Sequence, residues 1–211
     1  MVKKNKSEYF ALFLAEFSAK GKERGEGFSV SNLNKLSGDE YRDAENILIN
    51  SIDEIRSVKA LAEIQSRKAI PLMQALLKKA EGPYKAAIVY ALWKLGVMDT
   101  ANVESFFVEM LMGEEEYLQI QILPYLGTFK SQRVIRALSS LIREAKSKEV
   151  ITNAFMILIQ DVCSFVAAKS FFESTYRRLL LDIISENAEL RKKALDILDQ
   201  DVQTCFNKMN R

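Results

Sequence analysis

Large apolar residues recur through most of this chain at an interval of about 31 residues, and this period constrains the fold more than any other feature of the sequence. One series occupies positions separated by 31, 31, 32 and 40 residues, namely Leu61, Leu92, Leu123, Phe155 and Leu195. A second series keeps the same register three residues later, at Ile64, Leu95, Leu126, Leu158 and Leu198. Within each segment apolar residues also recur three and four positions apart, which is the spacing of one helix face. Since a single helical hairpin cannot bury its apolar face, equally spaced hairpins predict an all-α solenoid.

Turn residues divide the chain into helix pairs. Pro71 suits the first turn of a helix, Gly82-Pro83 interrupts the helical pattern, and Gly96 follows the last apolar residue of its segment. We predict about five antiparallel pairs in residues 39–200, of which the last three cover 102–126, 132–160 and 167–198. The whole chain, 1–211, is predicted to be a single domain of helical repeats.

The two ends of the repeat array need covers, because terminal repeats would otherwise expose an apolar face. Residues 7–38 are predicted to form an N-terminal cap helix and a loop, with Phe10, Phe13 and Phe17 on one stripe that packs against the first pair. The long last pair is expected to close the other end, and residues 201–211 are expected to be a C-terminal tail.

Two segments resemble the HEAT-repeat consensus. The first runs from Ile55-Arg56 through Ala60-Leu61 to Ile64 and continues as Ala69-Ile70-Pro71-Leu72, and the second runs from Ala86-Ala87 through Ala91-Leu92 to Leu95-Gly96. The resemblance is clear over 53–96, fades through 99–163 and is weakest in 165–200. It implies a curved armadillo-like stack, in which the first helices lie outside and the second helices line a concave groove. HEAT proteins usually bind proteins, so the resemblance constrains the fold more than the function.

The second helices separate into packed and exposed columns. A column of mostly small residues belongs to the packed face, at Ala60, Ala91, Ile122, Ala154 and Ala194, while the column led by Lys59 lies roughly 150–180° away. We predict that partner-binding residues line the groove on the polar side, at Lys59, Glu63, Tyr90, Trp93, Lys94, Gln121, Tyr125 and Asn153. Tyr90 and Tyr125 are the favoured exposed contacts, whereas Trp93 and Met156 have the alternative of bridging adjacent repeats as core. Pro124 is expected to bend its helix, because it cannot donate to the carbonyl of Ile120.

Several classes of function lack the residues that they need. The chain has no histidine, its two cysteines, Cys163 and Cys205, are far apart, and no glycine-rich phosphate loop is present. Glu114-Glu115-Glu116 stands at a helix start, where carboxylates favour the macrodipole without any metal. We therefore expect no catalysis, no cofactor and no metal site. No segment is apolar and long enough to predict a membrane span, and two cysteines are typical of reduced thiols in a cytoplasmic protein.

The sequence thus predicts a monomeric, non-enzymatic module that binds a protein partner in its groove, as a scaffold, an inhibitor or an immunity protein that neutralises a toxin. The alternative is a nucleic-acid-binding or DNA-repair protein similar to the HEAT-like DNA glycosylases. The formal charge of +2 argues against that alternative, as do groove columns that mix both signs. Arg133, Arg136 and Arg143 lie on a first helix, outside the groove. The densest basic cluster is near the C-terminal end, at Arg177, Arg178, Arg191, Lys192 and Lys193, where Glu186 and Glu189 can pair with it.

Overall fold

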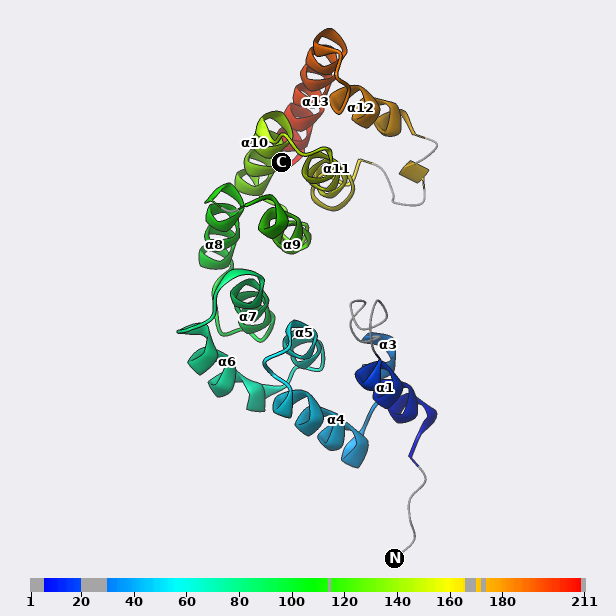
Figure 1. Cartoon of the computed structure of the whole chain (residues 1–211), viewed down its shortest axis with the longest axis vertical. Coiled ribbons are helices and arrows are strands. Elements are labelled where there is room, and N and C mark those ends of the chain that lie inside the picture. Colours follow the sequence, from blue (N-terminus) through cyan, green and yellow to red (C-terminus); the bar gives the residue numbers. More distant parts are fainter. Residues whose placement is uncertain (1–5, 20–29, 114, 166–169, 172–173, 210–211) are drawn as a thin grey trace, which may run out of the picture. The chain divides into compact units, whose positions relative to one another are not determined.

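The computed structural model describes residues 6–19, 30–113, 115–165, 170–171 and 174–209, and every regular element in these residues is a helix (Figure 1). The predicted all-α class is therefore confirmed. The chain divides into two compact units, Met1–Val103 and Glu104–Arg211, where the sequence predicted one domain. Each unit is described by itself.

The first unit begins with α1 (Glu8–Ser18) and the short α3 (Val30–Leu33). Two helix pairs follow, α4 (Gly38–Asn50) with α5 (Ile55–Glu63), and α6 (Ile70–Leu77) with α7 (Gly82–Lys94). A single 3₁₀ turn, η1 (Arg67–Ala69), leads into α6, and α5 packs on α4 and on α7. The helices and their partners agree with the pairs predicted from the sequence.

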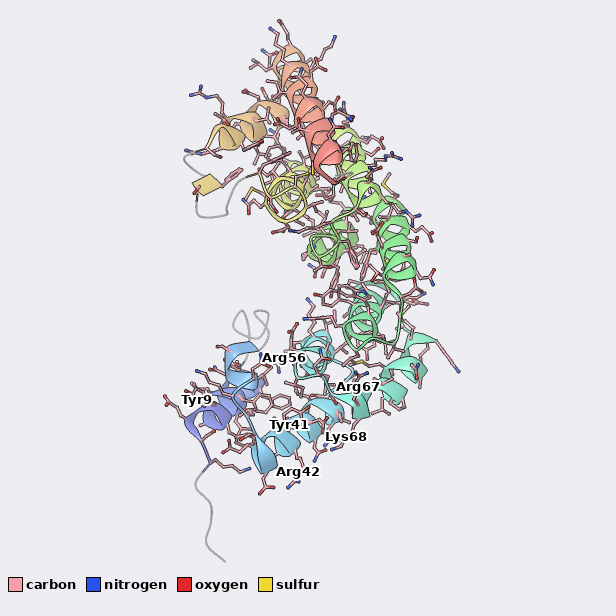
Figure 2. The ribbon with its side chains drawn as sticks, turned by 180° about the vertical axis from the view of Figure 1, so that it is seen from behind. Tyr9, Tyr41, Arg42, Arg56, Arg67 and Lys68 are labelled. Atoms are coloured by element: carbon pink, nitrogen blue, oxygen red, sulfur yellow. The ribbon has the colours of Figure 1, made fainter. Side chains whose placement is uncertain are left out.

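Helix α1 covers the first pair, as the aromatic stripe predicted. Phe10 and Phe13 are buried, and α1 contacts both α3 and α4. At its start, Ser7 caps the helix by accepting a hydrogen bond from Phe10 N and donates through Oγ to Glu40 on α4, at 2.7 Å. At its end, the guanidinium of Arg56 on α5 donates to the carbonyl oxygens of Glu16 and Phe17, at 3.1 and 2.8 Å (Figure 2). Polar contacts at both ends therefore fix α1 against the first pair.

The turns after α5 and α7 have the same local structure, and they lie one repeat apart. After α5, Ser66 N donates to Leu61 O at 2.9 Å, and after α7, Val97 N donates to Leu92 O at 2.9 Å. This 6→1 bond defines a Schellman C-cap, which needs a left-handed residue before the donor. Gly96 meets that need with φ +74°, as the sequence predicted for this glycine, whereas Gln65 adopts φ +55° despite its side chain.

A buried carboxylate joins α4 to the turn that follows α5. The side chain of Glu45 is 5% exposed, accepts a hydrogen bond from Ser66 Oγ at 2.7 Å and pairs with Lys68 Nζ at 2.8 Å. Burial alone would raise the pKa of Glu45, but the bonds from Lys68 and Ser66, with the Lys68 charge, lower it below the usual 4.5. Beside it, Tyr41 OH donates to Ile64 O at 2.8 Å, and Figure 2 places Tyr41 and Lys68 close together.

Glu45→Gln is expected to lower the free energy of unfolding by about 1–2 kcal/mol at neutral pH, because it removes a buried charged acceptor. Since folding lowers the pKa of Glu45, its contribution is complete above pH 4.5 and is lost as the pH falls through the folded value. Urea unfolding of both proteins should therefore show the difference shrinking in acid. Asp43→Asn, on the same helix with a side chain 50% exposed, is the control and should change stability by about 0.5 kcal/mol or less. A difference that persists unchanged in acid would contradict the role of the Glu45 charge.

The second unit holds three further helix pairs. The first is α8 (Thr100–Gly113) with α9 (Glu116–Leu126), the second is α10 (Gln132–Glu144) with α11 (Lys148–Met156), and the third is α12 (Thr175–Ile183) with α13 (Ala188–Met209). The boundary between the two units lies within α8. The helix of α11 continues as a π-helical segment, η2 (Ile157–Val162). Phe107 of α8 contacts Tyr125 of α9, and α10 packs on α11 and on α13.

The predicted C-terminal tail is wrong for residues 201–209, which continue α13, while residues 210–211 lie outside the described part of the chain. Val202 and Cys205 are buried and extend the apolar stripe that Leu198 begins, at the spacing of one helix face. Phe206 lies beside the guanidinium of Arg136 on α10, with 5.7 Å from its ring centroid to the guanidinium carbon. Burial of this stripe keeps the end of the chain helical.

The predicted packed columns are buried almost throughout. Every member of the Ile64 series and of the Ala60 column is buried, and in the Leu61 series only Leu195 keeps intermediate exposure. The 31-residue register therefore identifies core positions in both units. None of the helices in the described ranges is long and apolar enough to span a membrane.

Candidate partner-binding surface

Five of the eight predicted partner-binding residues lie on two neighbouring helices of the first unit. Lys59 and Glu63 are on α5, Tyr90, Trp93 and Lys94 are on α7, and these two helices pack together. Six residues of α7 are buried, at Ala86, Ala87, Ile88, Val89, Ala91 and Leu92, so its remaining side chains define its accessible face. We call this set the α5/α7 surface: Lys59, Glu63, Tyr90, Trp93 and Lys94.

An ion pair joins the two helices at this surface. Lys94 Nζ lies 2.5 Å from Glu63 Oε1, and each side chain is 28% exposed. The same ammonium lies 5.9 Å from the centroid of the Tyr90 ring, within the range of a cation–π contact. The ion pair therefore holds a positive charge over the edge of an aromatic cluster.

Two partly exposed aromatic side chains form that cluster. The rings of Tyr90 and Trp93 lie 5.6 Å apart at an interplanar angle of 46°, and Trp93 Nε1 donates to Thr100 Oγ1 at 3.1 Å. Trp93 thus has neither the full burial of a core residue nor the exposure of a free side chain. Rigid aromatics of this kind give a large contact area at a small cost in side-chain entropy.

Partial burial changes the protonation equilibria of this surface. The pKa of Tyr90 is raised, mainly by burial. The charge of Lys94 lowers this pKa and the charge of Glu63 raises it. The phenol therefore stays neutral and can donate a hydrogen bond. Partial burial also lowers the pKa of Lys59, although this residue belongs to the exposed surface. Because each group is partly removed from water, a partner that covers them has less desolvation cost to overcome.

The prediction that Tyr125 is an exposed contact is wrong. It occupies the position of Glu63 and Lys94 in the next repeat, yet it is only 5% exposed, and its ring stacks on Phe107 at 5.1 Å and 18°. Phe107 itself contacts Phe129, so aromatic packing between α8 and α9 draws the tyrosine into the core. Pro124 lies inside α9 as expected, and its own side chain is exposed.

The other two predicted residues of the second unit are polar and accessible but do not join the cluster described above. Gln121 is exposed, whereas Asn153 is partly exposed and donates through Nδ2 to Glu149 O in its own helix, at 2.9 Å. Met156, one of the two residues with alternative interpretations, is half-buried and accepts from Gln160 Nε2 at 3.5 Å. With Tyr125 in the core, the second unit offers no comparable aromatic surface at the predicted positions.

The C-terminal basic cluster is divided by internal contacts. Lys193 pairs with Glu189 at 2.7 Å, and Arg191 donates to Arg143 O at 3.1 Å. Glu186 pairs at 3.6 Å with Lys148, which belongs to another helix pair. Arg177 and Arg178 are exposed on α12. The cluster is therefore a solvated and partly neutralised face, and it does not form a continuous row of free charges for phosphates.

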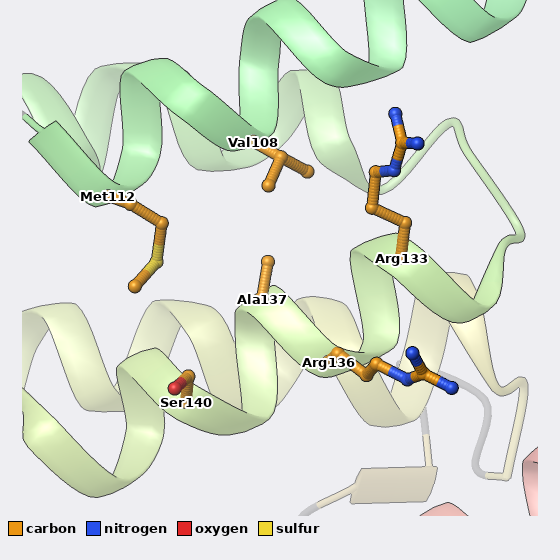
Figure 3. Close-up of a pocket in the computed structure, with 6 residues that line it drawn as sticks. All are labelled: Val108, Met112, Arg133, Arg136, Ala137 and Ser140. Carbon is orange, nitrogen blue, oxygen red and sulfur yellow. The ribbon is translucent and has the colours of Figure 1, made fainter.

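Sequence reasoning missed a pocket between α8 and α10 in the second unit. It is lined by Val108, Met112, Arg133, Arg136, Ala137 and Ser140 and has a cavity volume of about 380 Å³ (Figure 3). The sequence predicts only that the two arginines lie on a first helix, and their spacing with Ala137 and Ser140 indicates one helix face. The lining residues come from 108–112 on α8 and from 133–140 on α10, so spacing within one helix can indicate an accessible face but not the hollow between the two helices.

No group of three or more histidine, cysteine, aspartate or glutamate side chains within the described ranges is placed to hold a metal ion. The sequence matches no family model, and searches among curated proteins and solved structures find no significant match. The assignment of function therefore depends on the surfaces themselves.

Proposed function

We propose that this chain is a HEAT-like α-solenoid of about five helix pairs and that it binds a partner protein through the α5/α7 surface. The observation that carries the proposal is the juxtaposition of two partly exposed aromatic rings, Tyr90 and Trp93, with the Glu63–Lys94 ion pair. Protein interfaces are enriched in aromatic anchors at the centre of a contact, while charged groups around them set orientation and partner choice.

The repeat register supports the HEAT-like assignment. Equivalent apolar positions are buried in successive second helices, and the same Schellman turn closes α5 and α7. A repeat stack that holds its core in this way leaves the polar columns of its second helices available for binding. We propose a non-catalytic role in a cytoplasmic monomer, as an inhibitor, an immunity protein or a scaffold for one partner.

The nucleic-acid alternative has less support at this surface. Glu63 pairs with Lys94 at 2.5 Å and neutralises the charge of its ammonium group. A duplex-binding face needs several arginines and lysines to neutralise phosphates, whereas this surface combines one carboxylate with aromatic rings. A mixed surface of this composition favours a protein partner.

The experiment places a photo-crosslinking amino acid at Tyr90 in one protein and at Tyr117 in another. A partner that crosslinks only from position 90 touches α7 specifically. Tyr117 is the matched control, because it is 67% exposed on α9 of the other unit. We then expect Tyr90→Ala to raise the Kd for the captured protein about tenfold, which is a loss of about 1.4 kcal/mol in binding free energy. Tyr117→Ala should leave the Kd unchanged. Calorimetric titration gives the affinity, and thermal melts confirm that the variant stays folded. An unchanged Kd for a folded Tyr90→Ala would remove the α5/α7 surface as the binding site.

A further inference from the structure

The pocket between α8 and α10 has chemically different ends. In Figure 3, the side chains of Arg133 and Arg136 lie at one end, Met112 and Ser140 lie at the other, and Val108 faces Ala137 between them. At the end away from the arginines, Ser140 Oγ donates to Glu144 Oε1 at 2.8 Å. The pocket therefore has a cationic end, an apolar middle and an end that carries Met112.

Arg136 presents a positive charge that no carboxylate of the described residues neutralises. Its guanidinium carbon lies 5.7 Å from the ring centroid of Phe206, a contact that restrains the cation without compensating its charge. Arg133 donates to Ser105 and has its nearest carboxylate, that of Glu104, at 3.9 Å, the outer limit of an ion pair. The guanidinium of Arg136 can therefore bind a carboxylate of a ligand, and that of Arg133 has only a weak ion pair to give up.

The apolar part of the pocket is accessible to a ligand. Met112 is 49% exposed although it lies beside Val108 in the hollow between the two helices. A flexible thioether at the mouth of a hollow adapts to differently shaped apolar side chains. The cavity of about 380 Å³ is large enough for an apolar side chain together with a neighbouring carboxylate.

We propose that this pocket binds a short acidic segment of a partner protein, with an apolar side chain against Met112 and Val108 and a carboxylate on Arg136. Planar guanidinium groups bind carboxylates through two parallel hydrogen bonds, which fixes the orientation of the segment as well as its affinity. A nucleic-acid strand fits less well, because two arginines are too few to follow a run of phosphates and Met112 offers nothing to a phosphate. The pocket shares no residue with the α5/α7 surface and belongs to the other unit, so it is a second binding site.

The test uses the full chain and the fluorescein-labelled peptide Asp-Glu-Leu-Leu-Glu-Asp, followed by fluorescence anisotropy. Two peptides separate the contributions, Asn-Gln-Leu-Leu-Gln-Asn without the charges and Asp-Glu-Ser-Ser-Glu-Asp without the apolar anchors. We expect the first peptide to bind, and we expect each change of peptide to weaken binding about tenfold. Added salt should weaken the binding of the acidic peptide and should change the binding of the amide peptide little.

Single substitutions at exposed positions locate the site. Arg136→Gln and Met112→Gln are each expected to raise the Kd of the acidic peptide about tenfold, while Arg178→Gln, at an exposed arginine of α12, should leave it unchanged. Tyr90→Ala should also leave it unchanged, which keeps this test separate from that of the α5/α7 surface. Failure of the acidic peptide to bind, equal binding of the amide peptide, or an unchanged Kd for Arg136→Gln would each overturn the proposal. Tighter binding of a labelled oligothymidylate than of the acidic peptide, lost in Arg136→Gln, would overturn it in favour of nucleic acid.

Discussion

Tyr125→Ala is expected to lower the free energy of unfolding by about 3–4 kcal/mol, although its position in the repeat marks it as a surface residue. The ring is 5% exposed and stacks on Phe107, so its removal opens a cavity between α8 and α9 that neighbouring side chains fill only in part. Large aromatic-to-alanine changes in cores cost about 3–5 kcal/mol, through lost transfer free energy and the cavity that remains. The 5% of Tyr125 that stays exposed places the expected value in the lower part of that range.

The matched control is Tyr117→Ala, because Tyr117 is on the same helix and 67% exposed. Its removal should change the free energy of unfolding by about 0.5 kcal/mol or less. Denaturant unfolding, with coincident fluorescence and circular dichroism transitions, gives both values. A Tyr125→Ala protein as stable as Tyr117→Ala would show that the ring is not packed on Phe107. Tyr125→Phe should retain most of the stability, since it keeps the stacked ring.

Arg56→Ala is expected to lower the free energy of unfolding by about 2–3 kcal/mol and to loosen α1 from the first pair. The guanidinium donates to two carbonyls in the last turn of α1, pairs with Glu54 at 2.7 Å and is 10% exposed. Its removal leaves partly buried acceptors without a donor, and each such loss costs about 1–3 kcal/mol where the group stays buried. The guanidinium also lies over the ring of Phe17, with 5.5 Å from the guanidinium carbon to the ring centroid, so the substitution removes this contact as well.

Arg42→Ala is the control for the loss of an arginine, because Arg42 is 66% exposed and pairs with Asp39 across one turn of α4. It should change stability by about 0.5 kcal/mol or less. Hydrogen exchange gives the specific readout: amides of α1 should lose protection in Arg56→Ala, while those of α7 should keep it. Equal protection of α1 in both variants would show that the Arg56 bonds do not hold it in place. Arg56→Lys should recover little, since one ammonium cannot replace the guanidinium fork.

The sequence predicted the helix pairs and most of the core because both depend on local spacing. Leu61, Leu92 and Leu123 are buried as their register indicated, and Gly96 has the backbone conformation expected of a helix C-cap. The end of α13 was predictable as well, since Val202 and Cys205 continue the spacing of Leu198, but the polar residues between them suggested a tail.

The site was predicted only in part because exposure depends on the neighbouring helix. Position within a repeat placed Glu63, Lys94 and Tyr125 in one column, yet Phe107 of the preceding helix covers the tyrosine alone. The pocket between α8 and α10 is another property of two elements, formed by residues that are unremarkable within each helix. The division into two compact units likewise depends on contacts that are distant in sequence.

The donor that completes the last turn of α1 lies 39 and 40 residues after the carbonyls it binds, and this separation bears on the order of events during synthesis. With 11 residues, α1 is shorter than the roughly 12–15 residues that an isolated helix needs to be even marginally stable in water. During synthesis, the bonds that complete α1 therefore cannot form until α5 has emerged. Its apolar face stays open to chaperones during that interval. In the mature protein we expect the same dependence to make the protection of α1 against hydrogen exchange follow the Arg56 contacts.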